Sequence, residues 1–190
     1  MPAPLKAIFF DVGNTLLFPD RTHILAPLHQ RNLKPTLDHW HAIARKTKKE
    51  FDAILQGKRH ARFGELVRYP ATHAREPAAA GTTLSACGIS NADGKIADVL
   101  ERCGIVDCFR TITDSGLVGH EKPHPAIFEV ALRELSVAPE EILYVGDMYS
   151  VDYVGATRAG MQAILFDVPG AYRDSGLPRV ESLEELEQKV

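Results

Sequence analysis

Residues 142–166 read ILYVGDMYSVDYVGATRAGMQAILF, and this stretch decides the fold. It opens with the apolar run ILYV, which predicts a short buried strand that ends at Gly146. A helix is expected to follow as far as Ala159, and residues 162–166 form a second apolar run that predicts another strand. A strand, a helix and a strand in this order predict a right-handed βαβ unit of a parallel sheet.

The same alternation extends through the rest of the second half of the chain. Asp93 is expected to cap a helix over residues 94–103, and Pro125 marks the first residue of another amphipathic helix. Residues 109–113 and 84–89 predict two more short strands. We therefore predict an α/β fold, a Rossmann-like doubly wound parallel sheet with helices on both faces.

Residues 19–70 have a different pattern and predict a small inserted α-helical unit. Apolar side chains recur at helical spacing over residues 37–56, and the basic run 45–49 within them is interpreted as a solvent-facing surface. On this reading residues 1–18 and 71–190 together form the core of the fold. Three leucines indicate a shorter helix earlier in the insert: Leu25, Leu28 and Leu33.

Composition places the chain among ordinary globular proteins. Its 190 residues are 45% hydrophobic and 25% charged, with a net charge of −3, which gives no electrostatic signature of binding to nucleic acid or to an anionic membrane. No apolar run approaches the roughly 18 residues of a membrane span, and the first residues do not resemble a signal peptide. Cys87, Cys103 and Cys108 lack C-x-x-C spacing and predict reduced thiols, so we expect a cytoplasmic protein.

Polar residues with chemical potential stand where the predicted strands end, and ligands of doubly wound sheets bind at these carboxyl ends. Three of them are carboxylates, and each close pair costs about 4 kcal/mol at ~4 Å and an effective dielectric constant of about 20. A hard divalent cation relieves this repulsion, and oxygen ligands favour Mg²⁺. A lysine and a serine nearby suit the oxygens of a phosphoryl group, and an aspartate can act as a nucleophile. These residues are Asp11, Ser90, Lys122, Asp147 and Asp152.

The sequence around these residues resembles the haloacid dehalogenase-like (HAD) superfamily of hydrolases. The matching segments are FFDVGNTLL, ISNADG, GLVGHEKPHPAIFEVAL and ILYVGDMYSVDYVGATRAGMQAI, and GDMYSVD has the Gly-Asp-x4-Asp spacing of the family. The resemblance implies a Rossmann-like core whose insert, after the first strand, is a C1-type helical cap over the active site. The insert of this chain is short for such a cap.

The resemblance also implies a role for each residue. Asp11 matches the nucleophile, and Ser90 matches the residue that hydrogen-bonds the phosphoryl group. Lys122 matches the lysine that stabilises the negative charge of the nucleophile and of the phosphoryl group. The implied Mg²⁺ ligands are Asp11, the carbonyl oxygen of Gly13, Asp147 and Asp152, the last either as a ligand or as a carboxylate behind the ligands. Three neighbouring polar residues are expected to contact the substrate: Asn14, Thr15 and Asn91.

Gly13 departs from the pattern of the family. Phosphatases of the superfamily usually carry a second aspartate here, which protonates the leaving oxygen and then activates water, and such a group contributes about 10²–10⁴-fold. We predict a Mg²⁺-dependent hydrolase, a phosphatase that acts on a small phosphate monoester through an aspartyl-phosphate on Asp11. It is expected to work slowly, to prefer good leaving groups or to borrow an acid, and the candidates for that acid are Asp20, His23, His120 and Glu121.

Three alternative functions stay open. The chain can be a non-catalytic or weakly active relative that binds a phospho-ligand or a protein. It can be a 2-haloacid dehalogenase, although such enzymes lack the paired aspartates that are present here as Asp147 and Asp152. It can also be a phosphonate hydrolase, which needs a cap lysine that forms a Schiff base. The candidates for that lysine are Lys34, Lys46, Lys48, Lys49 and Lys58.

Overall fold

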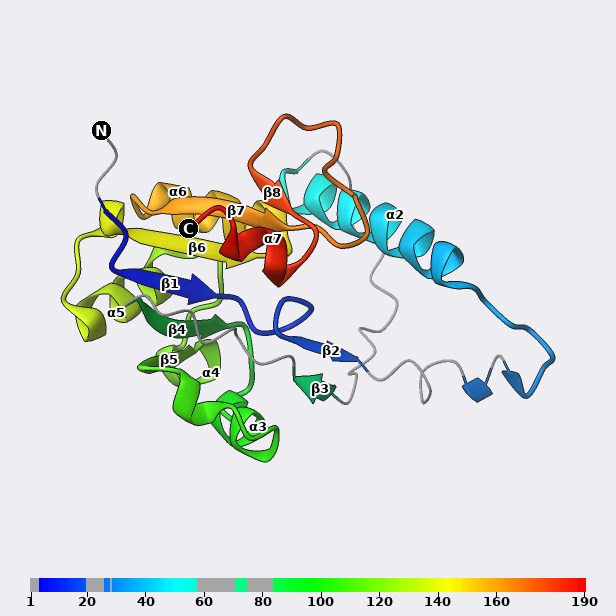
Figure 1. Cartoon of the computed structure of the whole chain (residues 1–190), viewed down its shortest axis with the longest axis horizontal. Helices are drawn as coiled ribbons and strands as arrows, with labels where there is room; N and C mark the ends of the chain where they lie inside the picture. Colours follow the sequence, from blue (N-terminus) through cyan, green and yellow to red (C-terminus); the bar gives the residue numbers. More distant parts are fainter. Residues whose placement is uncertain (1–3, 20–25, 28, 58–70, 75–83) are drawn as a thin grey trace.

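The computed structural model describes residues 4–19, 26–27, 29–57, 71–74 and 84–190. Its centre is a parallel six-stranded sheet with the strand order β5-β4-β1-β6-β7-β8 (Figure 1). The strands are β1 (Ala7–Phe10), β4 (Ser85–Ser90), β5 (Thr111–Asp114), β6 (Ile142–Gly146), β7 (Gln162–Phe166) and β8 (Arg179–Val180). The predicted doubly wound α/β fold is confirmed.

Helices cover both faces of this sheet, because successive side chains of a strand point to opposite sides and both sides are apolar. Phe9 of β1 packs in one apolar cluster with residues of α5 and α6, whereas Phe10 packs in a second cluster with residues of α3 and α7. The helices are α3 (Ile96–Arg102), α4 (Ser115–Val118), α5 (Pro125–Leu135), α6 (Val154–Arg158) and α7 (Leu183–Glu187). Short turns of helix complete the core: η1 (Val106–Cys108), η2 (Pro139–Glu141) and η3 (Tyr149–Tyr153), the last a π-helical turn.

One predicted helix cap was wrong. The helix expected over residues 94–103 begins at Ile96, and the Asp93 side chain does not cap it. The carboxylate of Asp114, at the end of β5, instead accepts hydrogen bonds of 3.0 Å from the backbone N–H groups of Gly94 and Ile96. The free N–H groups at the start of the helix are thus satisfied by a residue from β5. The spacing of residues near the helix does not predict such a distant acceptor.

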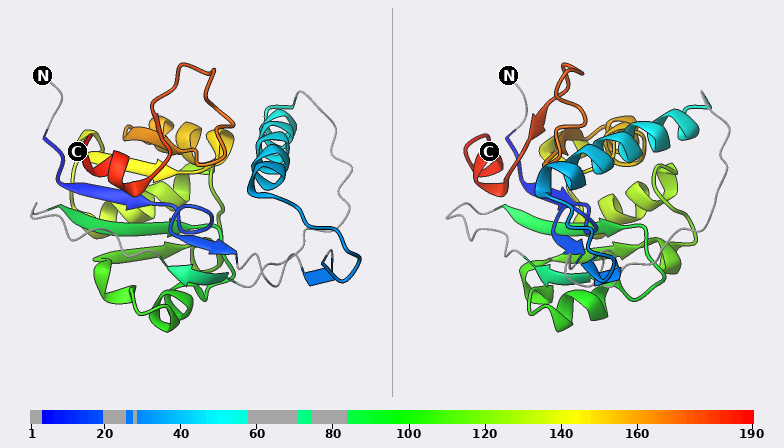
Figure 2. Two further views of the ribbon diagram at one scale, coloured as in Figure 1. Left: turned by 45° about the vertical axis from the view of Figure 1, so that its right-hand side comes forward. Right: turned by 90° about the vertical axis from the view of Figure 1, so that its right-hand side faces the viewer.

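The insert lies between two strands that pair with each other. β2 (Leu17–Pro19) and β3 (Ala71–Ala74) form an antiparallel two-stranded sheet. Between them runs α2 (Leu37–Leu55), which we call the cap helix for its position only, and it confirms the helix predicted over residues 37–56. Figures 1 and 2 show α2 beyond the carboxyl ends of the central strands. The full extent of the insert stays a prediction, since Leu25, Leu28 and residues 58–70 lie outside the described part of the chain.

The cap helix contacts the core through charged residues, so the interpretation of residues 45–49 as a solvent-facing run was wrong for two of them. Arg45 donates a hydrogen bond of 2.8 Å to the carbonyl oxygen of Pro169. Lys48 donates one of 2.8 Å to the carbonyl oxygen of Asp147, and its side chain is only 12% exposed. Residues three apart on a helix lie on the same side, and the sequence does not show which side faces the core.

No helix in the described ranges combines the length and the apolar character that crossing a membrane requires.

Candidate active site

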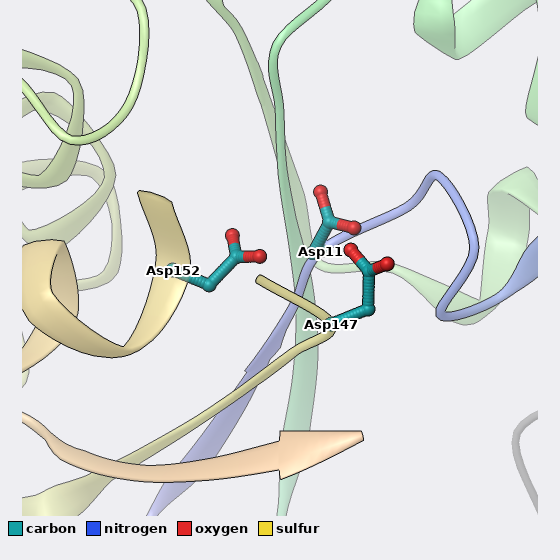
Figure 3. A group of neighbouring side chains, drawn as sticks. All are labelled: Asp11, Asp147 and Asp152. Carbon is teal, nitrogen blue, oxygen red and sulfur yellow. The ribbon is translucent and has the colours of Figure 1, made fainter. Parts of the chain in front are cut away.

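Three carboxylates meet at the carboxyl edge of the sheet. Asp11 follows β1 directly, Asp147 follows the neighbouring strand β6, and Asp152 comes from the π-helical turn η3. One oxygen of each carboxylate lies within 4.8 Å of the other two, and Figure 3 shows the three groups turned toward a common space. Because β1 and β6 are adjacent and parallel, with Phe10 paired to Val145, the residues that follow them reach the same point.

Lys122 is buried among these carboxylates, with its side chain 1% exposed. Its Nζ lies 2.6 Å from Oδ1 of Asp11 and 2.8 Å from Oδ1 of Asp152, and it donates to the hydroxyl of Tyr144 at 2.8 Å. It also donates to the carbonyl oxygen of Ile89 at 2.9 Å. Burial alone would lower the pKa of Lys122, but Asp11 and Asp152 outweigh burial and hold that pKa well above its usual value.

The Lys122 ammonium does not fully balance the negative charge around Asp11. Burial raises the pKa of Asp11 to about 7, with Lys122 opposing the rise and the charges of Asp152 and Asp147 adding to it. Its second oxygen, Oδ2, accepts a longer hydrogen bond of 3.2 Å from the hydroxyl of Thr15. A site that disfavours its own carboxylate charge to this extent is suited to a cation.

Asp152 is held on both of its oxygens by the protein. Oδ1 accepts from Tyr144 at 3.0 Å as well as from Lys122, and Oδ2 accepts from the backbone N–H of Met148 at 2.9 Å. The close approach of Asp152 to β6 requires Gly146, because a Cβ at that position would lie 2.5 Å from Cγ of Asp152. Asp152 therefore orients Lys122 and adds negative charge.

Asp147 carries the signs of a cation ligand. Burial raises its pKa, with Lys48 of the cap helix opposing the rise. Within the described ranges its Oδ2 is buried and accepts no hydrogen bond of acceptable geometry, although Nζ of Lys48 lies 2.9 Å away as an ion-pair partner. A buried carboxylate that already pairs with a cation and lies close to two other carboxylates fits a hard divalent cation such as Mg²⁺.

These groups line a cavity of about 230 Å³, and Ser90 and Gly13 lie on its wall. Gly13 is exposed there, and a Cβ built on it would meet no atom within 4 Å. Nothing in the backbone packing thus requires a glycine, and the missing side chain leaves open space beside the predicted nucleophile. The cavity gathers every residue that was predicted to be catalytic: Asp11, Ser90 and Lys122.

The residues predicted to contact the substrate lie in different settings. Thr15 is fully buried and donates to Asp11, so the structure gives it a partner in the protein. The side-chain amide of Asn91 bonds both the backbone N–H of Lys122, at 2.7 Å, and its carbonyl oxygen, at 3.0 Å. It thereby holds the loop that carries the lysine. Asn14 lines a neighbouring cavity beneath the cap helix.

The two predicted substitute acids that lie within the described residues are not found in the site. His120 and Glu121 are exposed, and neither lines the cavity around Asp11. The ring of His120 stacks on that of His124 with 4.2 Å between their centroids. Asp20 and His23 lie outside the described residues.

Tyr144 was not anticipated from sequence as a residue of the site, and Lys48 was not singled out. Tyr144 was read only as part of a buried apolar strand, yet its hydroxyl contacts both Lys122 and Asp152. A tyrosine in such a run is a weak signal for a polar role, because buried hydroxyl groups need a partner. Lys48 was one of five candidate lysines for a Schiff base and belonged to the basic run interpreted as solvent-facing, and no feature of the sequence distinguishes it from Lys49.

Comparison with known proteins agrees with this geometry. Residues 86–166 match the family model of haloacid dehalogenase-like hydrolases. Glyceraldehyde 3-phosphate phosphatase of Methanothermobacter thermautotrophicus is 47% identical over 66 residues, which are 35% of this chain and 29% of that protein. Haloacid dehalogenase-like hydrolase domain-containing protein 3 of Mus musculus is 35% identical over 102 residues, which are 52% of this chain and 40% of that protein.

The matches thus span less than half the length of these curated relatives. Among solved structures, a HAD phosphatase from Thermococcus onnurineus superposes with a TM-score of 0.65 at 20% identity, over 97% of each chain. At this identity the likeness concerns the fold. The matched range 86–166 contains Ser90, Lys122, Asp147 and Asp152 but not Asp11, which the structure brings to them.

Proposed function

This chain belongs to the haloacid dehalogenase-like hydrolase superfamily, and we propose that it is a Mg²⁺-dependent phosphatase of small phosphate monoesters, with Asp11 as its nucleophile. The observation that carries the proposal is the placement of Lys122 between Asp11 and Asp152, with Asp147 beside them. The carboxylates suit a bound cation, and the cation and the lysine ammonium together suit the oxygens of a doubly charged phosphoryl group. The named phosphatase among its relatives supports the same activity.

The reaction divides into two displacements at phosphorus. Lys122 holds Oδ1 of Asp11 at 2.6 Å, so the more loosely held Oδ2 is the oxygen that forms the bond to phosphorus as the bond to the leaving oxygen breaks. Ser90, on the cavity wall, donates to a phosphoryl oxygen. Water then attacks phosphorus in the aspartyl-phosphate, which releases inorganic phosphate and restores the carboxylate.

The residues for the cation are assigned in the same proposal. Asp11, Asp147 and the carbonyl oxygen of Gly13 would hold Mg²⁺, and Asp152 would stand behind them because both of its oxygens already have partners. The bound ion supplies charge neutralisation of the phosphoryl oxygens and of the carboxylates. The close approach of three buried carboxylates, with one oxygen of each within 4.8 Å of the other two, is the observation that supports this assignment.

A phosphonate hydrolase is the second candidate, and one observation favours it. Lys48 of the cap helix reaches the site, and Gly13 is a small residue at the position where such enzymes carry one. The ion pair with Asp147, however, engages the amine that a Schiff base would need. Reduction with borohydride in the presence of an aldehyde-bearing phosphonate would trap that adduct on Lys48. If the protein is a phosphatase without a Schiff-base lysine, the same treatment is expected to leave the mass of Lys48 unchanged.

The test is release of inorganic phosphate from acetyl phosphate and from a panel of phosphate monoesters, with and without Mg²⁺. We expect turnover that requires the metal and that Asp11→Asn abolishes. Turnover that survives either change would overturn the mechanism. A second readout is thermal: Mg²⁺ is expected to raise the melting temperature of the wild type and not of Asp147→Asn. Stabilisation by Mg²⁺ without any turnover would identify a binding protein instead.

A further inference from the structure

A second cavity, of about 350 Å³, lies between the cap helix and the core. It adjoins the active site, because Asp147 and Met148 line both cavities. Aromatic rings make up much of its wall: Trp40 and Phe51 come from α2, and Phe18 and Phe166 from the core. We call this space the aromatic cavity. Its volume is within the range of roughly 300–1,000 Å³ that is typical of sites for small molecules.

The lining of the aromatic cavity also includes polar side chains, those of Asn14, His41, Thr47 and Lys48. Lys48 lines the aromatic cavity and forms the ion pair with Asp147 of the metal-ligand set. The core rings of Phe18 and Phe166 lie 6.3 Å apart, within the range of favourable aromatic pairs. A group that enters from the phosphoryl site would thus pass an ammonium and then meet aromatic faces.

Gly13 independently restricts the leaving group. No carboxyl side chain stands at this position, and of the candidate acids that the structure describes neither His120 nor Glu121 lines the cavity around Asp11 to protonate a departing oxygen. An alkoxide is a poor leaving group without such a proton. An aryl oxide, whose charge spreads into its ring, departs without one, and the ammonium of Lys48 lies at the junction to offset that charge.

From these two observations we propose that the substrate is a phosphate monoester of a phenol, that is, an aryl phosphate, with its ring seated in the aromatic cavity. This proposal rests on the phosphatase activity proposed above. An oxygen of Asp11 bonds to phosphorus while the bond between phosphorus and the aryl oxygen breaks. The aryl oxide leaves with the electron pair and takes its proton from water. A second water then hydrolyses the aspartyl-phosphate to inorganic phosphate.

The first test measures binding alone, in the wild type with its cap intact. Phenylphosphonate and methylphosphonate, which carry no leaving group, are compared as inhibitors of acetyl phosphate turnover. We expect phenylphosphonate to inhibit at a concentration at least about tenfold lower, the scale of discrimination by an apolar pocket. Equal inhibition by the two phosphonates would overturn the proposal and leave the phosphatase activity standing.

The second test uses variants of the cap helix. We expect Phe51→Ala to lower the ratio of kcat/KM for 2-naphthyl phosphate to that for acetyl phosphate by about tenfold, and Phe51→Leu to restore part of it. Ile43→Ala is the matched control, because Ile43 lies on the same helix and is 63% exposed. A ratio that Phe51→Ala leaves unchanged would overturn the proposal. Failure of the wild type to hydrolyse acetyl phosphate would instead contradict the phosphatase activity itself.

Discussion

The hydroxyl of Tyr172 donates a hydrogen bond of 2.6 Å to Oδ2 of Asp52, which lies 120 residues earlier on the cap helix. Both residues are buried, and Oδ1 of Asp52 accepts a second hydrogen bond, of 2.9 Å, from the backbone N–H of Ser150. Asp52 thus joins α2 to the segment after β7 and to the π-helical turn that carries Asp152. This junction fixes the helix beside the active site.

Tyr172→Phe is expected to destabilise the protein, because it leaves a buried carboxylate without one of its donors. The cost of such a loss is about 1–3 kcal/mol of unfolding free energy, measured by urea denaturation. Tyr153→Phe is a matched control, since no hydrogen bond of the Tyr153 hydroxyl occurs within the described residues. Equal stability of the two variants would show that Asp52 does not depend on Tyr172.

Gly13→Asp is expected to raise kcat toward alkyl phosphates, because it restores a group that can protonate the leaving oxygen. A carboxyl in that role typically contributes about 10²–10⁴-fold, and the open space around Gly13 accommodates it. The measurement is steady-state phosphate release. Gly13→Asn is the control for side-chain volume, and a rate as high as that of Gly13→Asp would refute proton transfer as the cause.

Lys122→Met is expected to abolish turnover and to lower stability by about 3–5 kcal/mol, because Asp11 and Asp152 are then left buried without their shared cation. The double variant with Asp152→Asn should regain part of the lost unfolding free energy, because one unpaired charge has been removed. Lys46→Met, at an exposed position of α2, provides the baseline for loss of a lysine. No recovery in the double variant would contradict this pairing.

Alkylation is expected to distinguish the cysteines by exposure. Cys108 is exposed, whereas Cys87 is buried in β4, and burial raises the pKa of its thiol, so less of the reactive thiolate forms at a given pH. Mass spectrometry after treatment with iodoacetamide should show Cys108 modified first and Cys87 modified only after unfolding. Labelling of Cys87 at the rate of Cys108 under native conditions would be inconsistent with this packing.

Most of the core was predictable from residue order, because its signals are local. Pro125 begins α5 as expected, and the apolar run at Ile142 becomes the central strand β6. Failures occurred where a partner distant in sequence supplied the contact. Asp114 rather than Asp93 provides the acceptor at the start of α3, and the carboxylate reaches that helix only because β5 lies beside β4.

The candidate site divides in the same way. Asp11 and Asp147 follow apolar strands, so residue order places both at the carboxyl edge of a parallel sheet. The pairing of β1 with β6, which makes the two carboxylates neighbours, is seen only in the structure. Which side of the cap helix meets the core is settled by packing between segments about 100 residues apart. That packing buries Asp52, leads Lys48 to Asp147 and closes the aromatic cavity. Helical periodicity does not predict this packing. It shows which residues share a side of the helix, but not which surface that side contacts.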